Sequence, residues 1–104
     1  MQIDIVNKKA QPRCWGVYIG RPSVLGNPYP VSKSRTHEQA VGEYRQWLRR
    51  QWQLGGRVRE ALLALAREYK RTGELTLVCW CKPYPCHGDV LAEAVMALVR
   101  KGRV

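Results

Sequence analysis

Apolar and polar residues along the 104-residue chain alternate with two different periods, which predicts a mixture of strands and helices. A period of two over Gln2–Val6, and again over residues 15–19, predicts two short strands. A near-continuous apolar run over residues 75–81 predicts a third strand, of the kind that is buried on both faces in a parallel sheet. Two glycines and three prolines in residues 20–30 exclude regular structure there.

Helical spacing of apolar residues predicts three helices. Residues 36–39, Thr-His-Glu-Gln, have the form of a capping box, and the helix that follows should end at the Gly-Gly pair 55–56. A second helix is predicted over residues 57–71, and a third from Gly88 or Asp89 onward. Helices placed between strands favour a single α/β domain over residues 1–104. We expect a two-layer or three-layer arrangement with three to four strands, at least partly parallel, like a fragment of a Rossmann fold.

Composition adds one strong feature, which is charge. The chain has 18 Lys and Arg against 8 Asp and Glu, for a formal net charge of +10. Such a surface attracts polyanions, so a nucleotide or nucleic acid is the expected partner, although the charge can also serve solubility alone. No apolar run approaches the roughly 18 residues of a membrane helix, and no signal peptide is recognisable. We therefore expect a cytoplasmic protein without a membrane partner, whose four cysteines are thiols or metal ligands.

Candidate chemistry is concentrated in Cys79–Asp89, where the buried strand ends and the third helix begins. In open α/β sheets ligands bind at this edge, and the first turn of a helix suits an anion such as a phosphate. Cys86 stands beside His87 and just before a helix N-terminus, and both features favour a reactive thiolate. We therefore take Cys86, His87 and Asp89 as candidate catalytic residues.

The same cysteines allow two other interpretations. Cys79, Cys81, Cys86 and His87 offer four soft ligands suited to zinc, although their spacing is not a standard one and Cys14 could replace one of them. Alternatively, the cysteines are small buried core residues, and Asp89 is only a favourable acid in the first turn of a helix. A zinc cofactor is thus left open.

A second unusual segment is the Gly- and Pro-rich loop that follows the second predicted strand. Arg21 could pair with a phosphate through two hydrogen bonds. Ser23 and Asn27 could hydrogen bond to a base or a sugar. The loop can also be read as a plain surface turn, in which Asn27 only caps the backbone locally.

The two segments together resemble a known family. The motifs are Tyr-Ile-Gly-Arg-Pro-Ser-x-x-Gly-Asn-Pro-Tyr from position 18 and Cys-Trp-Cys-x-Pro-x-x-Cys-His-Gly-Asp-Val-Leu from position 79. They are similar to an uncharacterised family of bacteria and their phages, a domain of unknown function, over about residues 16–99. The family label implies no reaction, but its shared positions add Cys81 and Pro83 to the ligand-binding candidates. Those shared positions are Gly20, Arg21, Ser23, Gly26, Asn27, Pro28, Cys79, Cys81, Pro83, Cys86, His87 and Asp89.

The sequence thus leads to a main hypothesis and two alternatives. The main hypothesis is a protein that binds a nucleotide, a nucleobase or nucleic acid at one site built from the Gly20–Pro28 loop and Cys79–Asp89. A hydrolase or transferase acting on nucleotides would be one form of it. The hypothesis requires a buried, ligand-sized cleft that joins Arg21 to His87. The alternatives are a non-enzymatic, zinc-stabilised nucleic-acid-binding module and a phage-type accessory protein that binds a host protein through its arginine-rich helices. The oligomeric state is left open.

Overall fold

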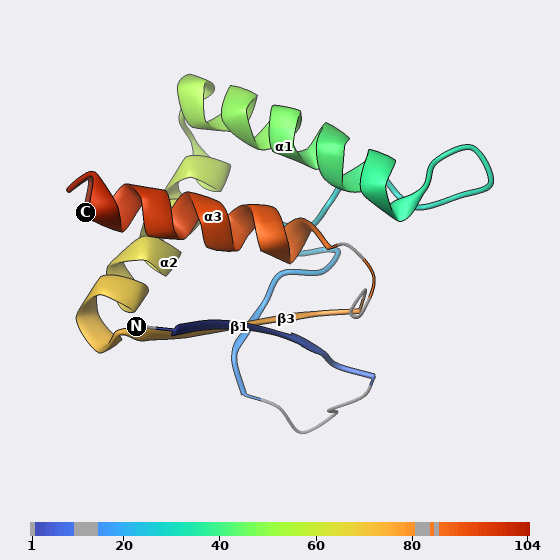
Figure 1. The fold of residues 1–104 in the computed structure, drawn as a ribbon. Helices are drawn as coiled ribbons and strands as arrows, with labels where there is room; N and C mark the ends of the chain where they lie inside the picture. The colour runs from blue at the N-terminus through green and yellow to red at the C-terminus, as the bar shows by residue number, and fades with distance from the viewer. Residues whose placement is uncertain (1, 10–14, 81–83, 85) are drawn as a thin grey trace.

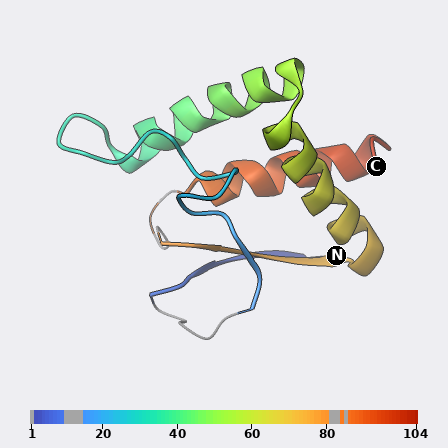
Figure 2. The same cartoon turned by 180° about the vertical axis from the view of Figure 1, so that it is seen from behind.

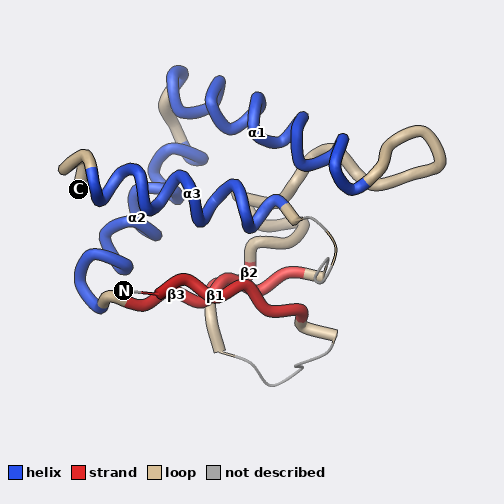
Figure 3. Tube along the Cα trace, viewed as in Figure 1, coloured by secondary structure: helices blue, strands red, loops and turns tan. Residues whose placement is uncertain are grey.

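All three helices lie on the same side of a small sheet, so the protein has one layer of helices and one layer of strands (Figure 1 and Figure 3). The view from behind shows the same arrangement (Figure 2). This computed structural model describes residues 2–9, 15–80, 84 and 86–104. In chain order the elements are β1 (Gln2–Asn7), β2 (Val17–Tyr18), α1 (His37–Leu54), α2 (Arg57–Thr72), β3 (Glu74–Cys79) and α3 (His87–Arg100).

The sheet is parallel throughout and has the order β1-β3-β2, so the strand that comes last in the sequence lies at the centre. Ile5 of β1 lies beside Leu77 of β3, and Val17 of β2 lies on the other side of Leu77. The crossover from β2 to its parallel neighbour β3 needs a long connection, and this connection contains α1 and α2. The expected α/β class is confirmed, with three strands and two layers in the described residues.

The core lies between the sheet and the helices. Leu75, Leu77 and Cys79 alternate along β3 and are buried in it, as the period of a strand requires. Tyr44 of α1 is fully buried and donates a hydrogen bond of 2.7 Å from its hydroxyl to the carbonyl oxygen of Leu25. This hydrogen bond satisfies a buried hydroxyl and fixes the loop after β2 to α1.

Local signals explain where the helices begin and end. The predicted capping box of α1 is confirmed, because the Thr36 side chain accepts from the Gln39 amide and the Gln39 side chain accepts from the Thr36 amide. Gly73, in the left-handed conformation with φ of 78°, ends α2. Helix α3 begins at His87, slightly earlier than predicted, because Cys86 acts as its N-cap.

Strand β2 is shorter than the strand predicted over residues 15–19. Its pairing with β3 nevertheless continues to Ile19, whose amide donates to the Val78 carbonyl at 2.9 Å. Val78 points away from the helices, yet it is buried, so the carboxyl end of β3 is buried on both faces as the apolar run predicted. Among the described residues, no helix is long and apolar enough to cross a membrane.

Candidate functional site

The two segments that carry the sequence motifs meet at one pocket. Its volume is about 110 Å³, and it is lined by residues from the loop 20–31, from the first turns of α1, and by Trp80 and His87. Arg21 and His87, which are far apart in the sequence, therefore line the same pocket, although it is smaller than the ligand-sized cleft that the main hypothesis required. The parallel sheet is the reason, because both segments follow the carboxyl ends of neighbouring strands.

Tyr18, the last residue of β2, links the two segments directly. Its hydroxyl donates to the carbonyl oxygen of Arg21 at 2.7 Å and accepts from the indole Nε1 of Trp80 at 2.9 Å. Gly20 is needed for this arrangement, because a Cβ at that position would lie 2.5 Å from the Tyr18 hydroxyl. The tyrosine thus holds the start of the loop and the Trp80 side chain on one side of the pocket.

Asn27 and the segment after it form the wall of the pocket that faces α1. The Asn27 side chain donates to the Ala40 carbonyl at 3.2 Å and accepts from the Tyr29 amide at 2.8 Å. Arg50 donates to the Tyr29 hydroxyl at 3.3 Å from the middle of α1. Asn27 lines the pocket, but its side chain is already hydrogen bonded within the protein. Its main role is therefore to hold this wall of the pocket in position.

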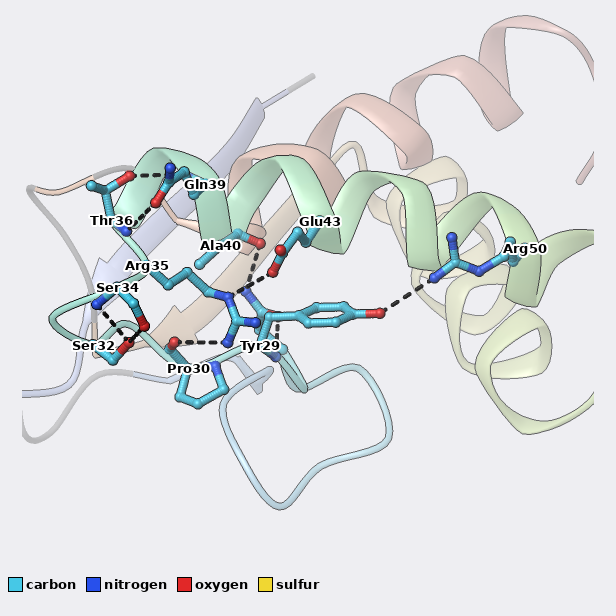
Figure 4. Close-up of polar contacts among 11 residues, drawn as sticks. Tyr29, Pro30, Ser32, Ser34, Arg35, Thr36, Gln39, Ala40, Glu43 and Arg50 are labelled. Atoms are coloured by element: carbon cyan, nitrogen blue, oxygen red, sulfur yellow. Dashed lines mark hydrogen bonds and ion pairs between the residues drawn. The ribbon is translucent and has the colours of Figure 1, made fainter.

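Arg35 reinforces the same wall. Its guanidinium forms an ion pair with Glu43 of α1 at 2.7 Å and donates to the Pro30 carbonyl at 3.3 Å (Figure 4). It also lies over the Tyr29 ring, 5.4 Å from its centroid. Residues 27–36 are therefore held to α1 by a set of polar contacts rather than by apolar packing alone.

His87 is buried at the first position of α3, with 5% of its surface exposed. Its Nε2 lies 2.6 Å from the Ile19 carbonyl oxygen, which can only accept, so Nε2 carries the proton. Burial lowers the pKa of His87, and the positive charge of Arg21 acts in the same direction, whereas the hydrogen bond to Ile19 opposes them. The ring is therefore neutral at pH 7, and its Nδ1 carries a lone pair that faces Cys86.

Cys86 and Asp89 together form the N-terminal cap of α3. The Cys86 sulfur accepts from the Gly88 amide at 3.3 Å, and the Asp89 carboxylate accepts from the Cys86 amide at 3.2 Å. The sulfur also lies 3.1 Å from the sulfur of Cys79 and 3.7 Å from Nδ1 of His87. Cys86 is 1% exposed, and neither it nor Asp89 lines the pocket. Of the three candidate catalytic residues, only His87 does.

Ser23 lies apart from this site. It lines a different surface hollow, between β2 and α2, and its amide donates to the Gly20 carbonyl within the turn. Cys81 and Pro83, the remaining ligand-binding candidates, and Cys14 lie outside the described residues. The described residues hold no group of three His, Cys, Asp or Glu that could bind a metal ion, so zinc binding through a set that includes Cys81 stays a prediction.

Several residues of the site were not anticipated from the sequence. Tyr18, Trp80 and Tyr29 lie within or next to the two motifs. That position in the sequence is the signal by which they could have been predicted as site residues. His37 lines the pocket from the start of α1, and its ring stacks on Tyr84 with centroids 4.7 Å apart. The buried contact of Tyr44 with His87, edge-on at 5.0 Å, left no signal in the local sequence.

Comparison with known proteins identifies the family of the chain. The model of a family described as a domain of unknown function, DUF4326, matches residues 4–97. This confirms the expected likeness to a domain of unknown function, and the matched residues include both segments that line the pocket. No curated protein and no solved structure matches the chain.

Proposed function

The chain belongs to the DUF4326 family, whose description assigns no activity, and we propose that it binds a nucleotide. The nucleotide would be either free or at the end of a nucleic-acid strand. The observation that carries this proposal is the pocket that Arg21, Trp80 and His87 line together. A cation, an exposed aromatic face and a fixed imidazole in one small pocket are the groups that recognise a phosphate and a base.

The size of the pocket limits what enters it. An apolar cavity of about 150 Å³ holds one benzene molecule, and this pocket measures about 110 Å³. A single base is therefore the largest part of a nucleotide that it could take up, and then only in part. The sugar and the phosphate would remain at the mouth of the pocket, where a longer strand could continue over the surface.

Trp80 offers the stacking surface. Its side chain lines the pocket, and the residue is 53% exposed, so part of it is open to a ligand. The hydrogen bond from its Nε1 to Tyr18 fixes the ring before any ligand arrives. A base that stacks on a ring already held in place forfeits little conformational entropy on binding.

Arg21 offers the charge. It is exposed, lines the pocket, and the described part of the chain places no carboxylate in an ion pair with it. The net charge of +10 adds a long-range attraction for any polyanion. The local contact of Arg21 should decide where the phosphate is held, and the overall charge should raise the rate of encounter.

The arrangement supports binding more strongly than catalysis. Nε2 of His87 is engaged by the Ile19 carbonyl, and Nδ1 faces the buried Cys86 sulfur, so neither nitrogen points to a bound ligand as a free acid or base. Cys86 and Asp89 lie behind the pocket wall as a helix cap. A nucleophilic attack by Cys86 on a nucleotide bound in the pocket would require this cap to open.

The test is a binding measurement on two variants with the same net charge. A fluorescein-labelled single-stranded oligothymidine is titrated with wild-type protein, Arg21→Gln and Arg67→Gln, and the four nucleoside monophosphates serve as competitors. Arg67 is an exposed residue of α2 and does not line the pocket. We expect Arg21→Gln to weaken binding about tenfold to a hundredfold, the range for one lost charge-assisted hydrogen bond. Arg67→Gln should weaken it much less.

Two further measurements, the salt dependence of binding and the effect of Trp80→Ala, test the same proposal. Binding should weaken as salt rises, because phosphate contacts release counterions. Trp80→Ala should weaken binding of the oligomer and of the competing monophosphates alike. Equal losses for Arg21→Gln and Arg67→Gln would show that only overall charge attracts the oligomer, and the proposal of a nucleotide site at this pocket would then fail.

A further inference from the structure

Cys79 and Cys86 come from different elements and place their sulfur atoms next to each other in the core. Cys79 ends β3 and Cys86 precedes α3, seven positions later. Both side chains are buried thiols, and their Sγ atoms lie 3.1 Å apart. A disulfide needs a separation near 2.05 Å, so an approach of about 1 Å would join them.

Both sulfurs are held in place by the elements that carry them. Cys79 is paired with Asn7 of β1 in the register of the sheet. The Cys86 sulfur accepts from the Gly88 amide, and the Asp89 carboxylate holds the Cys86 amide. A Cβ at Gly88 would lie 3.0 Å from Ile19, so the start of α3 is packed closely on the sheet. The positions of β3 and of the start of α3 therefore hold the two sulfurs next to each other. This gives each sulfur a high effective concentration near the other.

We propose that Cys79 and Cys86 form a redox-active dithiol, which a peroxide oxidises reversibly to an intramolecular disulfide. In the first step the Cys86 sulfur attacks hydrogen peroxide, the O–O bond breaks, a sulfenic acid forms, and the thiol proton leaves with the displaced hydroxide as water. In the second step the Cys79 sulfur attacks the Cys86 sulfur, an S–S bond forms, the S–O bond breaks, and a second water leaves. Two electrons pass from the two sulfurs to the peroxide.

The surroundings favour Cys86 as the sulfur that reacts first. It lies at the N-terminus of a helix, where the backbone amides stabilise negative charge on a sulfur. Because both sulfurs are buried, a small oxidant such as hydrogen peroxide is better suited than a bulky disulfide. The last step needs only the neighbouring Cys79, which is already in contact.

Oxidation would also alter the pocket. In the reduced state the Cys86 sulfur lies 3.7 Å from Nδ1 of His87 and 3.1 Å from the Cys79 sulfur, and its thiol proton can be donated to either atom. A disulfide has no proton to donate. Since His87 lines the pocket, the oxidation state of the pair would change the hydrogen bonding of one pocket wall. The proposal itself does not depend on what the pocket binds.

The experiment uses the full chain, reduced and then freed of reductant. Hydrogen peroxide is added, the remaining thiols are alkylated and counted, and the chain is cleaved after Trp80 without reduction, which separates Cys79 from Cys81 and Cys86. We expect the loss of two thiols per chain, a covalent link between the Cys79 and Cys86 peptides, and recovery of both thiols with dithiothreitol. The double variant Cys14→Ser, Cys81→Ser should give the same link.

A second variant traps the intermediate. In Cys79→Ser the reaction should stop at the sulfenic acid of Cys86, which dimedone labels at that residue only. The peptide map of the wild-type chain decides the proposal even if this variant fails to fold. Linkage of Cys86 to Cys81 or Cys14 would overturn it. One zinc ion per chain, with the thiols protected from peroxide until a chelator is added, would overturn it as well.

Discussion

Helices α1 and α3 both begin with a capping box and a histidine that lines the pocket, but the two caps lie in different surroundings. Thr36 is exposed and forms hydrogen bonds with Gln39 at 3.1 and 2.8 Å. Cys86 is buried and uses a sulfur, a weaker acceptor than a hydroxyl, at 3.3 Å. The first cap is thus an exposed hydroxyl, whereas the second is a buried sulfur that also lies beside Cys79 and His87.

The two histidines differ in the same way. His37 is half-buried and stacks on Tyr84, which is itself 60% exposed. His87 is buried, hydrogen bonded to the Ile19 carbonyl and packed edge-on against Tyr44. The part of the pocket wall at His87 therefore rests on the core of the protein, and the part at His37 rests on its surface.

The largest expected effect comes from removing the two rings in turn. His87→Ala would leave a cavity beside Tyr44 and a buried Ile19 carbonyl without its donor. We expect it to lower the free energy of unfolding by about 2–4 kcal/mol. His37→Ala should lower it by less than about 1 kcal/mol. Urea denaturation at pH 7.5 measures both, and similar losses at the two positions would contradict the distinction between a core wall and a surface wall.

A smaller effect is expected in the pH dependence of stability. Burial, and then Arg21, lower the pKa of His87 below its unfolded value near 6.5, although the Ile19 hydrogen bond, Cys79 and Asp89 act in the opposite direction. Below about pH 6.5 the unfolded chain therefore binds a proton that the folded chain refuses, and stability falls. The contribution of this residue approaches at most about 1.4 kcal/mol per pH unit.

The measurement compares wild type with His87→Gln in urea between pH 8 and pH 5. The gap in the free energy of unfolding between the two should narrow as the pH falls, because only the wild type has this histidine to protonate on unfolding. A gap that widens at low pH would mean that the folded state binds the proton better than the unfolded chain does.

The smallest effects separate the two caps. Thr36→Ala removes a hydroxyl acceptor and should cost about 1 kcal/mol of stability. Cys86→Ser keeps an acceptor for the Gly88 amide and should change stability by less than about 1 kcal/mol. Thermal unfolding with a chelator present, and again without it, measures both variants. A loss for Cys86→Ser several times that for Thr36→Ala, found only without chelator, would point to the zinc interpretation.

The starts of α1 and α3 also differ in how well the sequence predicted them. The capping box at Thr36 was predicted, because a hydroxyl and an amide at that spacing are a common N-terminal signature. The box at Cys86 was missed, because cysteine is an uncommon N-cap and its neighbours had been assigned to chemistry instead. Asp89 turns out to hold the Cys86 amide, which agrees with the plainer interpretation of it as a first-turn acid.

The shared pocket was predicted from the parallel order of the strands and not from any local sequence pattern. Two loops that follow parallel strands were expected at one edge of the sheet, and Arg21 and His87 do line one pocket. Ser23 does not, because the turn from Gly20 directs it toward α2. The link through Tyr18 to Trp80 depends on β2 lying next to β3, and this strand order is not encoded in any short stretch of sequence.

The central position of β3 also sets an order of events during synthesis. Among the described strands, β1 and β2 each pair with β3 and not with each other, so neither finds a partner before the ribosome has made Glu74–Cys79. At typical rates of elongation, several seconds separate the completion of β1 from that of β3. Helices α1 and α2, whose hydrogen bonds are local, can form within microseconds of emerging. The newly made chain can therefore form helices before the sheet. The sheet forms only when β3 is available to pair with β1 and β2.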